Sequence, residues 1–392
     1  MKVLMVTRET ASDRRYGLGK SLAPLVEGLS LAGVPTLYFD QTESQSVPLR
    51  GPFVLLPEIL GFWGRKLKSP CLFALEERIR VGMAAAAHAK ALQLTHVHLH
   101  DPWLALGFLV GAFGFSKDTI LWGVTQHGYG SYANAARVDG IPQSRGLNRC
   151  LHTLERKLLE RASWVITPTR QAFGQLLEDL GVAVPPSNWR VIPHPRPEFE
   201  VLSKARARQI LGISDSDVVM LAIGRLVPLK HFDRIIEAFA ALSEKSPALS
   251  LVILGGGDPS ALQGLARRLG VDSRIRILCV DEVASYLFAA DLYVSASETE
   301  SFGLANFEAL CAGLPCICSS VGGVPEVLRD GALLYDPESS RLEDLLLPLI
   351  QDAKRREDLG RKGLEVVKDY PSRHEIVRKY LDVYQSASLN RP

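Results

Sequence analysis

The sequence predicts an α/β fold with two Rossmann-like domains, each a doubly wound parallel sheet, that face each other across a cleft. Its 392 residues exceed what one ordinary core accommodates. Short, nearly continuous apolar runs alternate with amphipathic stretches, as expected for strands that helices cover on both faces. This alternation breaks at the proline-rich segment 184–197 and then restarts.

The apolar runs define the expected strands of each domain. In the first domain they are Lys2–Thr7, Pro35–Phe39, His96–His100, Ile120–Thr125, Trp164–Pro168 and Arg190–Pro193. In the second they are Val218–Gly224, Leu249–Leu254, Ile275–Cys279, Leu292–Ser295, Cys316–Ser319 and Leu333–Tyr335. The predicted division is residues 1–196 for the first domain and 197–370 for the second, followed by residues 371–392.

Composition excludes several classes of protein. Lys and Arg number 45 against 43 Asp and Glu, so the chain lacks the basic field that bulk nucleic-acid binding needs. The longest uncharged apolar run, Trp103–Phe115, is 13 residues, too short for a bilayer span of about 20 residues, and predicts a buried helix. The N-terminus lacks a secretory pattern, and six scattered cysteines show no zinc spacing. These features predict a cytoplasmic protein.

The segment from Glu300 to Glu308 carries the strongest chemical signal. It follows a predicted strand and opens a helix over Leu304–Ala312. Gly303 allows the backbone to approach a ligand closely, and the free amides of a first helical turn favour phosphate. The two carboxylates can therefore line one pocket for an elongated ligand with hydroxyl donors.

This Glu-x7-Glu arrangement, followed by Ala309-Leu-Cys-Ala-Gly-Leu-Pro315, resembles the signature of the retaining family 4 glycosyltransferases, which have the GT-B fold. Four further segments resemble that family in the same order along the chain: Gly224-Arg-Leu-Val-Pro-Leu-Lys230, Gly255-Gly-Gly-Asp258, Ala289-Ala-Asp291 and Tyr380-Leu-Asp-Val-Tyr384. The resemblance covers the second domain densely and the first only loosely. It implies that residues 1–196 are the acceptor-side domain, that 197–370 are the donor-binding domain, and that 371–392 form a helix that crosses back to the first domain.

The resemblance implies roles for residues of the second domain. Arg225 and Lys230, beside Gly224, would hold a diphosphate, which suits a guanidinium fork and a point charge. Glu308 would bind ribose hydroxyls, and Glu300 hydroxyls of the transferred sugar. The remaining donor contacts would come from the backbone of Ser301, Phe302, Gly303 and Leu304, and, near the base, from Cys279 and Val280.

The first domain offers fewer signals. His127 ends a strand and resembles the family's histidine that contacts the donor sugar; a structural capping role is the alternative. The stretch Tyr129–Asn134 reads as a mobile loop. Asp101, Trp103 and Tyr129 are candidates for the acceptor side. His96, His98 and His100 share one strand face, but a metal site is rejected because three ligands from one strand diverge poorly.

The loop after the first strand departs from the family, which carries two adjacent glycines there. Gly17 matches the second glycine, whereas Tyr16 replaces the first. Gly17 and Gly19 remain candidates for donor contacts, although a Gly-x-Gly by itself is a weak signal. Arg14 and Arg15 add positive charge near the expected acceptor entrance.

The segment Gly61–Lys68 combines Phe62 and Trp63 with the cations Arg65, Lys66 and Lys68. Aromatic side chains beside cations suit an anionic membrane surface or a phosphorylated lipid. An exposed basic turn is the equal alternative. The first reading places the protein peripherally on the inner face of the membrane.

These signals predict a retaining glycosyltransferase that moves a hexose-type sugar from a UDP- or GDP-sugar to a glycan, lipid or small-molecule acceptor. His127, Glu300, Arg225 and Lys230 would be its catalytic residues. No metal or other cofactor is expected, because the cations and helix amides can stabilise the leaving diphosphate. The alternatives are a nucleotide-sugar epimerase of the same fold and a non-catalytic two-lobed sugar-binding protein.

Overall fold

The computed structural model describes residues 1–9, 17–49, 51–115, 120–138, 140–141 and 144–389. The chain divides into two compact units. The first contains nearly all residues up to His194 together with the C-terminal segment from Arg373, and the second contains Pro195–Ser372. The predicted domain boundaries, after residues 196 and 370, lie two residues from these.

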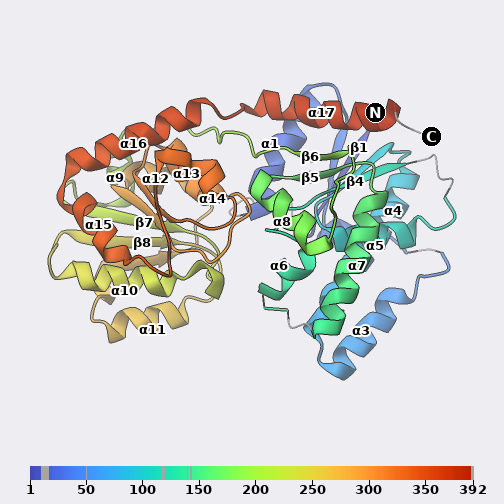
Figure 1. Ribbon diagram of the computed structural model, residues 1–392, viewed down its shortest axis with the longest axis horizontal. Coiled ribbons are helices and arrows are strands. Elements are labelled where there is room, and N and C mark those ends of the chain that lie inside the picture. Colours follow the sequence, from blue (N-terminus) through green and yellow to red (C-terminus); the bar gives the residue numbers. More distant parts are fainter. Residues whose placement is uncertain (10–16, 50, 116–119, 139, 142–143, 390–392) are drawn as a thin grey trace. The chain divides into compact units, whose positions relative to one another are not determined.

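The described part of the first unit contains a six-stranded parallel sheet in the order β2-β1-β3-β4-β5-β6 (Figure 1). The strands are β1 (Val3–Val6), β2 (Thr36–Phe39), β3 (His96–Leu99), β4 (Leu121–Thr125), β5 (Val165–Thr167) and β6 (Trp189–Val191). The helices are α1 (Gly17–Leu31), α2 (Gln41–Gln45), α3 (Leu56–Leu67), α4 (Pro70–Ala91), α5 (Pro102–Gly111), α6 (Tyr132–Val138), α7 (Arg145–Arg161), α8 (Arg170–Leu180) and α17 (Arg373–Leu389).

Both faces of this sheet are buried, which explains the continuous apolar runs. Along β1, Val3 and Met5 pack on one face with α1 and α17, whereas Leu4 and Val6 pack on the other face with α4 and α5. α17 lies close to α1, where a Cβ atom at Gly28 would come 2.5 Å from Val377 Cγ2. The C-terminal helix is therefore part of the first unit's core.

The second unit repeats this plan with another six-stranded parallel sheet among its described residues, in the order β12-β11-β10-β7-β8-β9. The strands are β7 (Val218–Ile223), β8 (Leu249–Leu254), β9 (Ile275–Leu278), β10 (Leu292–Ser295), β11 (Cys316–Ser319) and β12 (Leu333–Tyr335). The helices are α9 (Lys204–Leu211), η1 (Pro228–Lys230), α10 (Phe232–Ser243), α11 (Ser260–Arg268), η2 (Asp272–Arg274), α12 (Ala284–Ala289), α13 (Leu304–Cys311), α14 (Val324–Leu328), η3 (Arg329–Gly331), α15 (Leu342–Gln351) and α16 (Ala353–Lys368).

The twelve strands correspond to the apolar runs of the sequence, and the prediction of two doubly wound parallel sheets is confirmed. The apolar run Trp103–Phe115 lies largely in α5, whose Trp103, Leu104 and Phe108 are buried in the first unit. Within the described ranges, no helix combines the length and the apolar character that a membrane span requires.

Candidate active site

The predicted donor residues of the second unit follow the carboxyl ends of adjacent strands. Arg225 and Lys230 follow β7, Cys279 and Val280 follow β9, and Glu300 follows β10. Strands β10, β7, β8 and β9 are consecutive neighbours in one parallel sheet. Their carboxyl ends therefore meet at one edge, which is the edge where open α/β sheets bind ligands.

Glycines let two loops at this edge approach each other. The Gly224 amide donates to Leu254 O at 2.9 Å, and Leu226 N donates to Gly256 O at 2.8 Å. A Cβ atom at Gly255 would lie 1.9 Å from Gly224 O, so no larger residue fits without moving the backbone. The glycine-rich turn thus fixes the backbone beside Arg225, whose side chain is exposed.

Lys230 and Glu300 are in direct contact. Lys230 Nζ donates to Glu300 Oε1 at 2.5 Å, and Ser297 Oγ donates to the same oxygen at 3.0 Å. The side chains are largely buried, with 19% of Lys230 and 16% of Glu300 exposed. Glu298 N also donates to Leu229 O at 2.8 Å, which joins the loops that carry the pair. Sequence analysis assigned these residues to different parts of a ligand and did not predict that they touch.

The start of α13 has the expected geometry. Gly303 precedes the helix with φ of 77°, in the left-handed region that favours glycine. Phe302 is buried against Phe307 and Tyr370, so only its backbone remains for a ligand contact. Glu308 lies about one turn further along α13, and it is buried, with 7% of its surface exposed. α13 therefore presents a helix N-terminus at the same edge as the Lys230–Glu300 pair.

Gly17 and Gly19 lie in the first turn of α1. The Gly19 amide donates to Glu9 Oε2 at 2.8 Å, so an acidic side chain of the same unit already occupies this amide. Glu9 was not identified from the sequence. Arg14 and Arg15 lie outside the described residues.

His127 follows β4, as predicted, but its ring is engaged by another histidine. His127 Nε2 lies 2.9 Å from His100 Nδ1, and the ring stacks on His194 with centroids 5.9 Å apart. Burial, followed by the neighbouring imidazoles, lowers the pKa of His127.

The histidines of β3 are hydrogen-bonded within the unit. His98 contacts the Tyr384 hydroxyl and Thr125 Oγ1, each at 2.7 Å, and His96 Nε2 lies 3.1 Å from Ser388 Oγ. In the part of the chain that the structure describes, no group of three or more His, Cys, Asp or Glu side chains is arranged to hold a metal ion.

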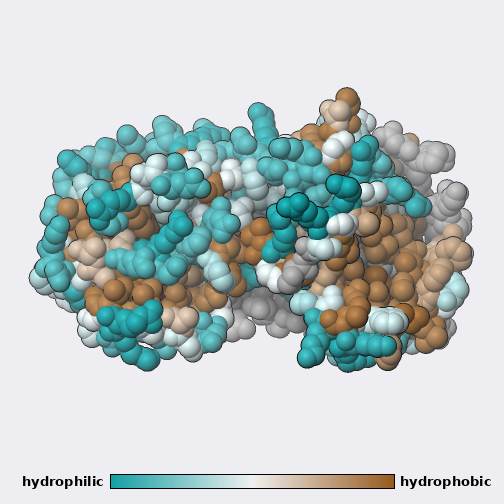
Figure 2. Space-filling view, turned by 60° about the horizontal axis from the view of Figure 1, so that its bottom comes forward, coloured by the Kyte–Doolittle hydropathy of each residue, from teal (hydrophilic) through white to brown (hydrophobic). Residues whose placement is uncertain are grey.

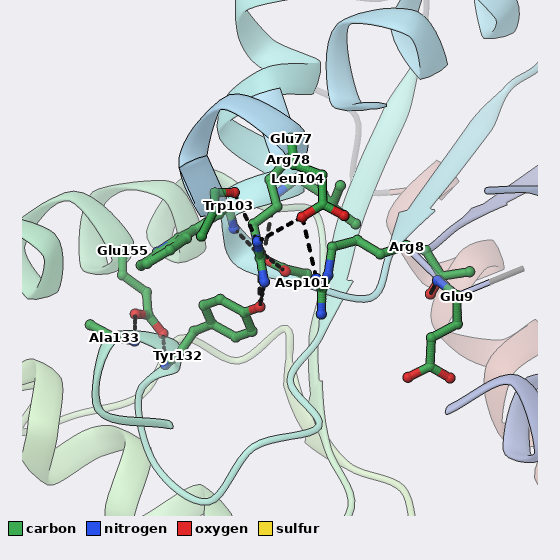
Figure 3. Close-up of polar contacts among 12 residues, drawn as sticks. Arg8, Glu9, Glu77, Arg78, Asp101, Trp103, Leu104, Tyr132, Ala133 and Glu155 are labelled. Carbon is green, nitrogen blue, oxygen red and sulfur yellow. Dashed lines mark hydrogen bonds and ion pairs between the residues drawn. The ribbon is translucent and has the colours of Figure 1, made fainter. Parts of the chain in front are cut away.

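Asp101 and Trp103 are buried in a polar network rather than displayed to an acceptor (Figure 3). Asp101 caps α5 by accepting from Trp103 N at 2.7 Å, and its Oδ2 accepts from Arg78 Nε at 2.9 Å. Arg78 also donates to the Tyr132 hydroxyl at 2.7 Å. The expectation that Asp101 and Trp103 line the acceptor side is therefore corrected: Asp101 neutralises a buried arginine, and the Trp103 side chain is core.

The stretch Tyr129–Asn134 is not a free loop, because part of it forms α6 and carboxylates bind its backbone. Asp179 Oδ2 accepts from Ser131 N at 2.7 Å, and Glu155 Oε1 accepts from Tyr132 N at 2.7 Å. Tyr129 itself is partly exposed. Glu155 is fully buried, and burial raises the pKa of its carboxyl to about 8. Its place on the apolar face of α7, four residues after Leu151 and three before Leu158, is a signal that the sequence contained.

The segment Gly61–Lys68 is mostly helical, in α3, so the alternative of a basic turn is wrong. The helix exposes apolar side chains, with Phe62 55% and Trp63 44% exposed, and Lys66 Nζ lies 4.9 Å from the centre of the Trp63 ring. Figure 2 shows apolar residues gathered on the surface of the first unit, at the right of the view. The exposed apolar residues of this unit include Phe53, Leu55, Ile59, Leu67, Phe73 and Phe113.

Two six-stranded parallel sheets, one in each unit, are the architecture of the GT-B class, and comparisons with known proteins agree. Sucrose-phosphate synthase from Thermosynechococcus elongatus has the same fold, with a TM-score of 0.79, 19% identity and coverage of 100% of both chains. A family model described as "Glycosyl transferases group 1" matches residues 203–366.

Curated relatives extend the match beyond the second unit. D-inositol 3-phosphate glycosyltransferase of Corynebacterium glutamicum is 30% identical over 310 residues, which cover 72% of this chain and 70% of the relative. N-acetyl-alpha-D-glucosaminyl L-malate synthase of Bacillus anthracis is 30% identical over 177 residues, which cover 44% of this chain and 46% of the relative. The chain spans about half the length of the Bacillus anthracis relative and of several further D-inositol 3-phosphate glycosyltransferases. The chain belongs to the group 1 glycosyltransferases.

Proposed function

We propose that the chain transfers a hexose-type sugar from a nucleoside diphosphate sugar to a hydroxyl acceptor, with retention of anomeric configuration and without a metal ion. The observation that supports this most strongly is the carboxyl edge of the second sheet. There, the Lys230–Glu300 pair, the exposed Arg225 and the N-terminus of α13 all follow the carboxyl ends of the neighbouring strands β7 and β10.

The Lys230–Glu300 contact suits this reaction. An ammonium group has three donors, so Lys230 can keep its bond to Glu300 while it binds a phosphate oxygen. Glu300 can likewise accept from Lys230, Ser297 and a sugar hydroxyl, because a carboxylate offers about four lone pairs. The pair would thereby link the sugar to the diphosphate.

The chemistry then consists of charge stabilisation and positioning. As the bond between the anomeric carbon and the phosphate oxygen breaks, negative charge grows on the leaving diphosphate. Lys230, Arg225 and the first amides of α13 stabilise that charge most in the transition state, which raises the rate. The acceptor hydroxyl attacks the same face and passes its proton to the departing phosphate oxygen.

The test measures nucleoside diphosphate released from a panel of UDP- and GDP-sugars, with and without acceptors. The relatives' names suggest D-inositol 3-phosphate and L-malate as first acceptors. We expect release with one donor to depend on an acceptor. Conversion of a donor without acceptor would favour an epimerase, and donor binding without turnover a binding protein.

A substitution of Glu308 tests the proposed binding of the donor. Glu308→Ala removes an acceptor for ribose hydroxyls, and a hydrogen bond to a charged group contributes about 1.5–3 kcal/mol, so donor affinity should fall about tenfold to a hundredfold. Glu237→Ala, on the exposed face of α10, is the control and should not change it. Unchanged donor affinity in folded Glu308→Ala would contradict the assignment.

We further propose that α3 contacts the anionic inner face of a membrane, where the acceptor could be a lipid. Exposed Ile59, Phe62 and Trp63 suit the headgroup boundary, while Arg65 and Lys66 attract anionic lipids.

A further inference from the structure

Ser297 is a buried serine whose hydroxyl is hydrogen-bonded to Glu300. It lies two residues beyond the end of β10 and is 2% exposed. Its Oγ donates to Glu300 Oε1 at 3.0 Å, the same oxygen that accepts from Lys230. Because a carboxylate only accepts, the single hydroxyl hydrogen of Ser297 goes to Glu300. Ser297 is then the acceptor in its 3.4 Å contact with Ser295 Oγ.

The backbone on both sides of this hydrogen bond is held by the loop after β11. Ser319, the last residue of β11, is 1% exposed, and its Oγ donates to Ser297 O at 2.7 Å. The Gly323 amide donates to Glu300 O at 2.9 Å. β10 and β11 are neighbours in the sheet, so these contacts are part of one framework. Both ends of the Ser297–Glu300 hydrogen bond are therefore attached to backbone that is fixed.

The two carboxylate oxygens of Glu300 have different surroundings. Oε1 accepts from Lys230 and from Ser297, which uses both of its lone pairs. Of the residues whose structure is described, none donates a hydrogen bond to Oε2. Oε2 is therefore the oxygen with which Glu300 can accept from a ligand.

Lys230 is poorly suited to hold Glu300 by itself once a diphosphate binds. Its ammonium group ends a flexible four-carbon stem, and a diphosphate attracts that positive charge. The Ser297 hydroxyl is uncharged, and it is joined to the fixed backbone through a single carbon. It therefore keeps its contact with Oε1 while Lys230 adjusts to the phosphates.

We propose that Ser297 is a positioning residue that keeps Glu300 Oε2 directed at a hydroxyl of the donor sugar. This inference rests on the proposed glycosyltransferase function and adds to it a residue that need not touch the substrate. Without Ser297, the Glu300 side chain would have to be ordered again each time a sugar binds, which lowers the affinity for the sugar part of the donor.

The test compares ligands with and without the sugar, by isothermal titration calorimetry of the full chain without acceptor. The probes are UDP-glucose, UDP-N-acetylglucosamine and GDP-mannose, each beside UDP or GDP alone. Ser297→Ala should weaken binding of the nucleotide sugar that the wild type binds about twofold to tenfold. It should leave the affinity for the nucleoside diphosphate unchanged, because Glu300 serves the sugar. A merely structural role would weaken both.

Three further variants isolate the hydrogen bond. Ser297→Cys nearly preserves the volume, but a thiol is a weak donor, so it should behave like Ser297→Ala. In a Glu300→Ala background, Ser297→Ala should cause no further loss, because the two residues act through one contact. Ser243→Ala removes another buried serine of the same unit, whose Oγ donates to Ala240 O at 2.8 Å, and should change neither affinity.

Two results would overturn the proposal: a folded Ser297→Ala that binds the nucleotide sugar as the wild type does, or one that loses affinity for the nucleoside diphosphate by the same factor. If Ser297→Ala does not fold, the same two affinities of Ser297→Cys decide. A wild type that binds none of the three nucleotide sugars would refute the proposed function, and the role of Ser297 with it. Unchanged affinities in Ser297→Ala, beside a wild type that transfers sugar, would refute the role of Ser297 alone.

Discussion

Replacing Asp101 tests whether this residue serves stability or an acceptor. Asp101 and Arg78 have only 6% and 4% of their side chains exposed, and Arg78 is further bound by Ala74 O and the Tyr132 hydroxyl. Although burial disfavours the charged guanidinium, Asp101 raises the pKa of Arg78, so this arginine stays charged. Asp101→Ala would leave that buried charge with only the more distant carboxylate of Glu77, 3.5 Å from Arg78 Nη1, as an ionic partner.

The expected loss can be worked from two contributions. Breaking a buried ion pair by removing one partner costs about 3–5 kcal/mol, and losing an N-cap costs about 1 kcal/mol. Asp101→Ala should therefore lower the free energy of unfolding of the first unit by about 4–6 kcal/mol. Asp101→Asn retains an oxygen for the cap and loses only the charge, so its loss should be smaller.

Chemical denaturation followed by circular dichroism and tryptophan fluorescence measures these differences. Ser144→Ala removes an exposed N-cap of the same unit and isolates the capping contribution of about 1 kcal/mol. Arg78→Met combined with Asp101→Asn should be more stable than Asp101→Ala, because no buried charge remains unpaired. If Asp101→Ala stays within about 1 kcal/mol of the wild type and instead weakens acceptor binding, the reasoning is refuted.

Three further predictions concern pH, metal and membrane. Burial raises the pKa of Glu155 from 4.5 to about 8, so the folded chain binds this proton more tightly than the unfolded chain does. The free energy of unfolding should therefore fall by up to about 1.4 kcal/mol per pH unit as the pH rises toward 8. Glu155→Gln should remove that slope in denaturation curves measured from pH 7 to 8. Activity should survive excess EDTA, whereas Arg225→Ala and Lys230→Ala should each lower kcat more than they raise KM; inhibition by EDTA that manganese reverses would contradict this. Phe62→Ser with Trp63→Ser should reduce sedimentation with anionic vesicles and leave turnover of a water-soluble acceptor unchanged; equal sedimentation would exclude α3 as the contact.

The strands, and the loops at the carboxyl edge of the second sheet, were predictable because their signals are local. A strand covered on both faces is apolar at every position, as in Val3–Val6, and the order of strands and helices fixes a parallel sheet. A left-handed glycine before a helix, as at Gly303, is also encoded within a few residues. These features do not depend on which distant residue packs against them.

The buried charges and the glycines of α3 were not predictable in this way. Gly61 and Gly64 suggest a turn, but they lie in a helix, where their small size lets α4 approach: a Cβ atom at Gly61 would come 2.5 Å from Glu76 Oε2. Similarly, a mobile loop was expected at Tyr129–Asn134 because its backbone partners, Glu155 and Asp179, lie more than 20 residues away along the chain. Such contacts require the tertiary structure.

The position of α17 has a consequence for biosynthesis. Tyr380 and Tyr384 are buried in the core of the first unit, and the Tyr384 hydroxyl is hydrogen-bonded to His98. Domains generally fold in the order of synthesis. Here, however, residues 195–372 of the second unit emerge from the ribosome before α17 is made. The unit whose first strand is translated first can therefore complete its core only after the whole of residues 195–372 has been synthesised.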